Sequence, residues 1–455
     1  MNMMNVLPRL AATGIALVCL QIAPASAAAK IQRVVSPGGI EAWFVQDATV
    51  PLIAMQFAFT GGSAQDPDGK AGTGSLAADT LDEGAGDLDS KTYHERLERR
   101  AIQMNFSVSR DYLRGSLRML KENRDEAFDL LRLALTSPRF DAEPLERVRA
   151  QTLSLLRRES TSPGSIASDR FWAAAYEGHP YARPSNGTLE SVPKIEAADL
   201  KDYVRRTLAR DNLKIAVVGD VDAETVGKLL DKTFGGLPAK SELTPVANID
   251  FAKTPQKFVV PLDVPQTAIL FGGAGIARND PDFMAAYIVN HIIGGGSLSS
   301  RLYHEVREKR GLVYSVSSSL IWMNHSSMFF GSTATRADKA GETLDTINAE
   351  LKRISEEGPT QKELDEAKSY LKGSQMLALD SSTKFAGALV QYQLDNLGID
   401  YLERRSGIID AVTLDDAKRV AKRIWGNGVL SVSVGRAPVA DASATPSATA
   451  PTAKN

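Results

Sequence analysis

The feature that most constrains the fold is an order of predicted elements that occurs twice along the 455-residue chain. Each half opens with an apolar strand ended by a Gly-Gly pair, at Leu52–Thr60 and at 266–271. Each half closes with a buried strand and a glycine, LKIAVVGD at 213–220 and VLSVSVGR at 429–436. Such self-similarity is typical of an internal duplication, so we expect two domains of the same kind.

Between these strands, both halves contain the same kinds of secondary structure. Alternating apolar residues predict paired strands at 104–108 and 113–117, and again at 313–320 and 328–333. Periodic apolar residues predict helices at 71–83, 124–135, 143–158, 166–176, 223–233, 280–293, 298–310, 343–356, 361–378 and 385–397, and the end of another at 97–101. The pattern predicts an α+β fold of two homologous domains of roughly 200 residues, each an antiparallel or mixed sheet covered by helices.

Composition marks the boundaries of these domains. A stretch interrupted by three prolines predicts a linker at 237–255. It separates an N-terminal domain at 31–240 from a C-terminal domain at 255–437. Residues 438–455 contain Ala, Ser, Thr, Pro and little else, so we expect a disordered tail there.

Residues 1–27 are similar to a secretory signal peptide. Arg9 supplies the positive charge, residues 10–20 are apolar but too few to span a bilayer, and Ala25-Ser26-Ala27 fits a cleavage site. Cys19 is the only cysteine, and Val18 occupies a place where a lipoprotein signal needs a small residue, so we expect no lipidation. We therefore expect a mature chain without cysteine and without a membrane span, exported to the periplasm of a bacterium.

The charge balance and the histidines limit the classes of function. Lys and Arg number 53 against 55 Asp and Glu, and this net charge of −2 disfavours nucleic-acid binding because no basic excess is available for phosphates. The five histidines include no pair three or four residues apart, so no helix turn presents a His pair to zinc. His94 with Glu98 and His304 with Glu308 have the i, i+4 spacing that is typical of surface helix pairs.

A glycine-rich loop, Gly294-Gly295-Gly296-Ser297, follows one predicted helix and precedes another. It lacks the lysine and the Ser/Thr that end a P-loop, so nucleotide binding is disfavoured. One interpretation is a helix stop followed by Ser297 or Ser299 as the cap of the next helix. The other is a loop that a substrate approaches closely, since glycine lets backbones come near. The two interpretations are compatible.

No motif for nucleophilic catalysis or for a catalytic carboxylate pair stands out. A serine nucleophile needs an elbow such as G-x-S-x-G after a strand, and Gly74-Ser75 does not match it. Asp82 and Glu83 are adjacent carboxylates at a predicted helix end, where a solvated face is the more usual role.

Three longer segments carry a family resemblance. They are FTGGSAQDPDGKAGTGSLAADTLDEGAG at 59–86, YEGHPYARPSNGTLESV at 176–192 and GGGSLSSRLYHEVREKRGLVYSV at 294–316. With these segments in order, the chain from about residue 31 to 437 resembles the pitrilysin/insulinase family of inverted-zincin metallopeptidases and the mitochondrial processing peptidase subunits. The resemblance implies two similar domains arranged as a clam around a peptide-binding cavity.

The catalytic motif of that family is missing. Active members carry H-x-x-E-H, in which two histidines bind zinc and the glutamate activates water. At the matching positions, the ligands are replaced by Ser75 and Asp79 and the base by Ala78. The third family ligand, a later glutamate, falls at 150–156 (AQTLSLL), where there is no carboxylate. The resemblance therefore implies a chain that holds no metal and cannot hydrolyse peptides alone.

Another part of the family's site is retained. Arg307 and Tyr314, within REKRGLVY, match an Arg/Tyr pair that family members supply from the second domain. The resemblance implies that this pair binds substrate and supports the transition state, because a guanidinium and a phenol can donate hydrogen bonds to a developing oxyanion. Without the resemblance, Arg307 would be interpreted as a surface ion-pair residue and Tyr314 as a half-buried strand residue.

The resemblance favours one function and leaves a second open. A chain with the Arg/Tyr pair but without metal ligands is expected to be the non-catalytic, site-completing subunit of a heterodimeric periplasmic zinc endopeptidase, acting on peptides or unfolded polypeptides. Its partner would be a homologous catalytic subunit with an intact H-x-x-E-H, and the zinc would be bound in that partner. The alternative is a non-catalytic scaffold or peptide-binding protein that uses the peptidase fold. An unrelated hydrolase has no motif to support it.

Overall fold

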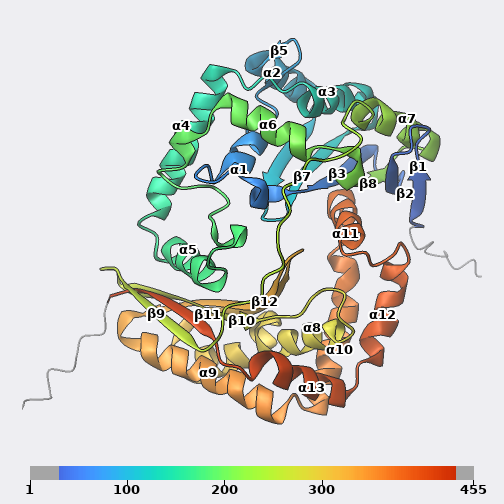
Figure 1. Ribbon diagram of the computed structural model, residues 1–455. Helices are drawn as coiled ribbons and strands as arrows, with labels where there is room; N and C mark the ends of the chain where they lie inside the picture. The colour runs from blue at the N-terminus through green and yellow to red at the C-terminus, as the bar shows by residue number, and fades with distance from the viewer. Residues whose placement is uncertain (1–29, 437–455) are drawn as a thin grey trace, which may run out of the picture.

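The computed structural model describes residues 30–436, which form two α+β domains (Figure 1). The predicted signal peptide (1–27) and the predicted tail (438–455) lie outside the described residues. Residues 235–255 join the domains and contain neither helix nor strand. Over the described range, no helix has both the length and the apolar character needed to cross a membrane.

The N-terminal domain is built on a mixed six-stranded sheet with the order β1-β2-β8-β3-β7-β6. Every neighbouring pair is antiparallel except β2 with β8. The strands are β1 (Gln32–Val35), β2 (Glu41–Gln46), β3 (Leu52–Thr60), β6 (Gln103–Val108), β7 (Tyr112–Leu120) and β8 (Leu213–Gly219), and a separate ribbon pairs β4 (Gly84–Ala85) with β5 (Leu88–Asp89). The helices are α1 (Thr73–Ala78), α2 (Ser90–Arg99), α3 (Arg124–Thr136), α4 (Ala142–Glu159), α5 (Pro163–Ala175), α6 (Ala197–Thr207) and α7 (Ala223–Phe234).

The C-terminal domain has a five-stranded sheet with the order β11-β12-β10-β13-β9, in which only β13 and β9 are parallel. The strands are β9 (Gln256–Pro261), β10 (Gln266–Ala274), β11 (Val313–Trp322), β12 (Ser327–Arg336) and β13 (Leu430–Gly435). The helices are α8 (Phe283–Asn290), α9 (Ala340–Glu357), α10 (Gln361–Leu377), α11 (Ser382–Leu394), α12 (Tyr401–Ala411) and α13 (Leu414–Trp425). Two further segments are π-helical, η6 (His291–Gly295) and η8 (Tyr303–Glu308).

The predicted duplication is confirmed by the topology. Strands β2-β8-β3-β7-β6 of the first sheet correspond in order to β9-β13-β10-β12-β11 of the second, with the single parallel pair in the same place. A phenylalanine–glycine pair is repeated at the centre of both sheets. Phe57 pairs with Gly115 and Phe271 with Gly331, and a Cβ at these glycines would lie 2.0 and 2.1 Å from the rings. Each phenylalanine ring thus lies over the glycine of the neighbouring strand, where any larger residue would collide with the ring.

Most predicted strands and helices are present, but one strand end is wrong. Strand β10 continues through Gly272 and Gly273 to Ala274. These glycines permit close packing instead of a turn, because a Cβ at Gly272 would lie 2.9 Å from the Phe171 ring, and one at Gly273 would lie 2.6 Å from the Phe329 ring. The helix predicted at 71–83 also ends early, at Ala78, before the β4–β5 ribbon.

Several elements were not predicted from the sequence. They are β1, β2, β4, β5, β9, α6, α12 and α13. Strands β1 and β9 are at sheet edges, and β2 and β9 each form a parallel pair with a strand more than 150 positions away. Their pairing therefore depends on tertiary structure that no local pattern shows. Helix α13 did have a local signal, because Ala417, Val420, Ala421 and Ile424 form one buried face.

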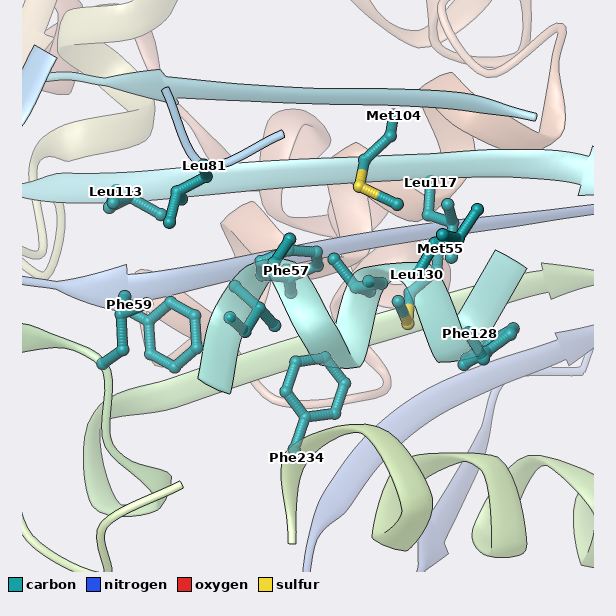
Figure 2. Close-up of a cluster of buried hydrophobic side chains, with 14 of the residues drawn as sticks. Met55, Phe57, Phe59, Leu81, Met104, Leu113, Leu117, Phe128, Leu130 and Phe234 are labelled. Atoms are coloured by element: carbon teal, nitrogen blue, oxygen red, sulfur yellow. The ribbon is translucent and has the colours of Figure 1, made fainter. Parts of the chain in front are cut away.

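The core of the N-terminal domain lies between its sheet and the helices α3 and α7. Figure 2 shows Phe57 and Phe59 of β3 in the same buried cluster as Leu130 of α3 and Phe234 of α7. The rings of Phe57 and Phe234 meet edge to face, with centroids 5.6 Å apart. This packing fixes the outer helices on one face of the sheet and leaves the opposite face for the other domain.

Each domain covers part of the other domain's sheet with one helix (Figure 1). Helix α5 of the N-terminal domain packs on β10 and β13, where Phe171 is buried near Leu270. Helix α11, at the equivalent place in the second repeat, packs on β3 and β8, where Leu389 and Val390 are buried with Ala58. The two inner faces are therefore covered reciprocally, and each sheet depends on the other half of the chain.

We expect Leu389→Ala to lower the free energy of unfolding by ~2–5 kcal/mol, because Leu389 is fully buried at this junction. Chemical denaturation measures this loss. Hydrogen exchange should also show reduced protection of β3 and β8, which belong to the N-terminal domain. Lys384→Ala, on the exposed side of the same helix, is the matched control and should change little. Reduced protection confined to the C-terminal domain would contradict the reciprocal packing.

Candidate functional site

Helix α1 carries the positions that match the family's metal ligands and base. The start of this helix is held by Asp66, whose carboxylate accepts hydrogen bonds from the backbone N–H groups of Gly72 (2.7 Å) and Gly74 (2.8 Å). Burial raises the pKa of Asp66 to about 7, although these donors favour its ionised form. Ser75 is half-buried, and its hydroxyl donates to the carbonyl of Ser185 at 2.9 Å. Helix α1 is thus well anchored, and Ser75, at the position of the first metal ligand, is hydrogen-bonded to Ser185.

Ala78 and Asp79 line a cavity of about 510 Å³ between α1, β6 and α4. Ala78 is buried and offers only a methyl group. Asp79 is exposed, and desolvation by the cavity walls raises the pKa of its carboxyl. Helix α4 contributes Gln151 and Leu155 to the lining, where the family's third ligand would be expected. The geometry brings these segments together, but their side chains do not form a metal-ligand set.

The acidic side of this cavity does not fit a zinc ion. Glu83 is 8% exposed, and both Ser90 Oγ and an Arg147 nitrogen donate to its carboxylate at 2.5 Å. A cation at this carboxylate would face the charge of Arg147. Within residues 30–436, no group of three or more His, Cys, Asp or Glu side chains is arranged to hold a metal ion. The interpretation of Glu83 as part of a solvated helix end is wrong, since it is buried and paired.

Of the two His/Glu pairs at i, i+4 spacing, both within the described residues, only one forms an ion pair in the structure. His304 Nδ1 lies 2.7 Å from Glu308 Oε2 on an exposed surface, so the predicted surface pair is confirmed. His94 instead faces Glu83, with Nε2 3.9 Å from Oε1. Among the described residues it forms no ion pair with Glu98. His94 therefore belongs to the wall of the α1 cavity.

Arg307 and Tyr314 lie together at the edge of the C-terminal sheet. Arg307 is on the π-helical segment η8, and its Nε donates to the carbonyl of Tyr314 at 3.1 Å. The guanidinium carbon is 5.1 Å from the centre of the Tyr303 ring and 5.8 Å from that of Tyr314. The Tyr314 side chain is 86% exposed, which corrects its alternative interpretation as a half-buried strand residue. The pair is thus preassembled and open to solvent.

A β-bulge accounts for the exposure of Tyr314. Val313 pairs with Thr335 and Val316 with Thr333, so two residues of β11 lie opposite one residue of β12. A bulge interrupts the alternation of side chains and turns a residue away from the sheet face. The Tyr314 ring is directed into solvent for this reason.

The glycine-rich loop is a close-packed helix end. Gly294 is buried against β11, and a Cβ there would lie 2.6 Å from Ser318 Oγ. The helix stop is confirmed, but the predicted caps are wrong: Ser300 Oγ accepts the hydrogen bond from the following segment, from the Tyr303 N–H at 3.4 Å. Gly295 is exposed and Gly296 is half-buried, so part of the loop is accessible to other molecules. The alternative as a substrate-approach loop stays a prediction.

The structure does not connect the two parts of the expected site within this chain. Ser75, Ala78 and Asp79 belong to the N-terminal domain, and Arg307 and Tyr314 to the C-terminal domain. Among residues 30–436, no hydrogen bond or ion pair joins the two groups.

Two crevices between the domains were missed by the sequence analysis. One, of about 540 Å³, is lined by residues that include Tyr112, Arg278 and Asp395. The other, of about 380 Å³, includes Arg110 and Trp172. Their residues come from both domains and from distant elements, so no motif marks them. The local sequence around Arg110 and Arg114 is itself polar, with Ser109, Asp111 and Ser116 beside them, so the two arginines do not stand out in it.

Comparison with known proteins now identifies the family. Residues 44–189 match the family model described as insulinase (peptidase family M16), and residues 194–371 match the one described as the peptidase M16 inactive domain. The chain belongs to the M16 peptidase family. The predicted pitrilysin/insulinase resemblance and the two-domain α+β fold are confirmed.

Several M16 relatives are similar over most of the chain. A Helicobacter pylori protein named non-peptidase homolog YmxG is 28% identical over 335 residues, 73% of this chain and 77% of the relative. A Bacillus subtilis protein named uncharacterized zinc protease YmxG is 25% identical over 352 residues, 77% of this chain and 85% of the relative. A crystal structure of a peptidase M16 inactive domain from Pseudomonas fluorescens has a TM-score of 0.83 at 29% identity, covering 90% of this chain and 98% of that one. Together with the missing ligands, these similarities support a non-catalytic role.

We expect the purified chain to contain no stoichiometric zinc, because Ser75, Ala78 and Asp79 offer neither imidazole ligands nor a base. Elemental analysis after dialysis against zinc-free buffer measures this directly. A triple variant, Ser75→His with Ala78→Glu and Asp79→His, is the matched control and should retain more zinc than the wild type. One tightly bound zinc per wild-type chain would contradict the prediction.

We also expect Asp82→Asn to gain stability relative to the wild type as the pH rises. Burial raises the pKa of the Asp82 carboxyl from 3.8 to about 6, so its contribution to stability is present at low pH and is lost as the pH rises through that value. Urea unfolding between about pH 4 and 7 tests this. The exposed Asp87→Asn is the control, and parallel stability curves for Asp82→Asn and the wild type would refute the prediction.

Proposed function

We propose that this chain is the non-catalytic, site-completing subunit of a heterodimeric zinc endopeptidase of the M16 family. Its partner is a homologous subunit with an intact H-x-x-E-H, which binds the zinc. Its substrate is a peptide or an unfolded polypeptide. The signal-like segment at 1–27 supports the bacterial periplasm as the place of action.

The observation that carries this proposal is the preassembled pair of Arg307 and Tyr314. The Tyr314 phenol is exposed, and Arg307 uses only Nε among the protein hydrogen bonds of residues 30–436. Its two terminal nitrogens therefore remain able to bind a ligand, and no carboxylate within 4.0 Å in this range neutralises its charge. A surface ion-pair residue would have such a carboxylate neighbour.

These free donors suit the transition state of peptide hydrolysis. When bound in the partner, zinc supplies Lewis acidity for the reaction. Negative charge develops on the scissile carbonyl oxygen, and Arg307 and Tyr314 donate hydrogen bonds to that oxygen or to the substrate backbone beside it. The hydrogen bond from Arg307 Nε to the backbone carbonyl of Tyr314 holds the Arg307 side chain beside residue 314, which lowers the entropy that Arg307 loses on binding.

A second candidate function is a non-catalytic scaffold or peptide-binding protein. Two observations favour this alternative: Arg307 and Tyr314 lie in a different domain from α1, and the Helicobacter pylori relative is named a non-peptidase homolog. Strands β6 and β11 each pair with one neighbour only among the described strands, so each has an edge to which an extended peptide can add. Binding without hydrolysis in the presence of the partner would distinguish it.

We expect Arg307→Ala and Tyr314→Phe each to lower kcat/KM of the reconstituted complex by about tenfold or more, because donors aimed at a developing oxyanion are typically worth ~3–4 kcal/mol. The loss should appear mainly in kcat if the contacts tighten only in the transition state. Steady-state kinetics on a quenched fluorescent peptide measures the effect, and gel filtration shows whether the complex assembles.

Two exposed residues serve as matched controls for these variants. Arg336→Ala removes a guanidinium that pairs with Asp338 at the end of β12, and Tyr370→Phe removes a phenol that is 61% exposed on α10. Both should assemble and cleave at the wild-type rate. If the Arg307 and Tyr314 variants also assemble and cleave at that rate, the site-completing role is refuted and the scaffold function is favoured.

A further inference from the structure

Two arginines lie in a crevice between the domains, without a carboxylate partner. The crevice has a volume of about 380 Å³ and is open to solvent. It is lined by Arg110 and Arg114 of the β6–β7 hairpin, Trp172 of α5, Trp322 of β11 and Gln391 of α11, among others. It shares Trp322 and Gln391 with the adjoining crevice of about 540 Å³. These volumes are within the ~300–1,000 Å³ that is usual for ligand pockets.

Neutral partners hold both guanidinium groups in position. The Arg110 guanidinium lies over the Trp172 ring, 3.4 Å from its centre, and its Nε donates to the Tyr181 carbonyl at 2.9 Å. Arg114 donates from one terminal nitrogen to Gln391 Oε1 at 2.6 Å. Within residues 30–436, the other guanidinium nitrogens of both arginines have no protein acceptor, and no Asp or Glu oxygen lies within 4.0 Å of either group. Both guanidinium groups are therefore held in position, while most of their N–H donors remain free to bind a ligand.

The carboxylates nearest to these arginines are engaged elsewhere. Asp111 accepts from the Tyr181 hydroxyl and, at 2.9 Å, from the Asn324 N–H. Asp395 accepts from Trp322 Nε1 at 3.1 Å and Gln391 Nε2 at 2.8 Å, and also faces Arg278 at 3.6 Å. Asp169 is on the exposed side of α5. Asp111 lines this crevice and Asp395 lines the adjoining one, so they offset part of the arginine charges, but they do not occupy the free donors.

Burial leaves both arginine charges poorly solvated. Desolvation lowers the pKa of Arg110 to about 10 and also lowers the pKa of Arg114. An anion that enters the crevice would replace the lost solvation of two cations.

We propose that this crevice binds a carboxylate group attached to a small apolar or aromatic body. The flat fork of a guanidinium matches the two oxygens of a carboxylate, and the indole rings of Trp172 and Trp322 provide walls for the apolar part. Such a ligand is either the C-terminal residue of a peptide or a free aromatic or aliphatic acid. The site belongs to this chain alone and does not depend on a catalytic partner.

The test uses the full purified chain without a partner and three probes: N-acetyl-leucyl-phenylalanine, its C-terminal amide, and 3-phenylpropionate. Calorimetric titration to about 5 mM ligand measures affinity, and tryptophan fluorescence reports on Trp172 and Trp322. We expect the acid peptide to bind about tenfold or more tightly than its amide, because the amide has no negative charge. Tighter binding of the peptide than of 3-phenylpropionate identifies a peptide C-terminus as the ligand, and equal or weaker binding identifies a free acid.

Variants show whether the arginines bind the ligand. Arg114→Gln should lower the affinity about tenfold or more, and Arg114→Lys, which keeps the charge but not the fork, should have an intermediate effect. Arg118→Gln, on an exposed position of the same strand, is the matched control and should bind as the wild type does. Thermal unfolding confirms that each variant is folded. Equal affinity for acid and amide, wild-type affinity of folded Arg114→Gln and Arg114→Lys, or no binding by the wild type would overturn the proposal.

Discussion

The reciprocal packing of α5 and α11 is the interaction on which the rest of this structure depends. Each helix leaves its own domain and buries apolar side chains on the sheet of the other, Phe171 in one direction and Leu389 in the other. Neither sheet has its inner face covered by its own half of the chain alone. The two domains are therefore held at one relative position, and the crevices between them have defined walls.

Polar contacts reinforce this junction. The turn between β11 and β12 enters the N-terminal domain, where the N–H groups of Asn324 and His325 donate to Asp111 and to the Tyr181 hydroxyl. A buried carboxylate that is bound by several donors costs little to keep in place, whereas its loss would leave those donors unsatisfied. The β11–β12 hairpin, which begins at Val313, is thus bound at its turn to the other domain. Tyr314 is carried by a strand whose orientation is set across the junction, and Arg307 of η8 is hydrogen-bonded to that strand.

The M16 architecture around α1 is retained although its metal ligands are not. Asp66 holds the start of the helix, and Tyr203 packs so closely on Gly74 that a Cβ there would lie 2.8 Å from its hydroxyl. The cavity beside α1 persists, but the ion pair of Glu83 with Arg147 now occupies its acidic side. Helix α1 is therefore anchored by contacts of the protein itself, and the segments that meet at its cavity are held together without a metal-ligand set among residues 30–436.

The sequence by itself determined the duplication, the two α+β domains, the central strands and the absence of H-x-x-E-H. These features depend on local periodicity and on residue identity, which a sequence displays directly. Only the tertiary structure decided that β10 continues through its glycines and that Glu83 is buried and paired with Arg147. It also decided that a bulge exposes Tyr314 and that Arg110 and Arg114 line one crevice. Each of these results depends on contacts with residues from distant segments, such as Phe329 on a neighbouring strand or Trp172 on helix α5. Local sequence patterns do not show such contacts.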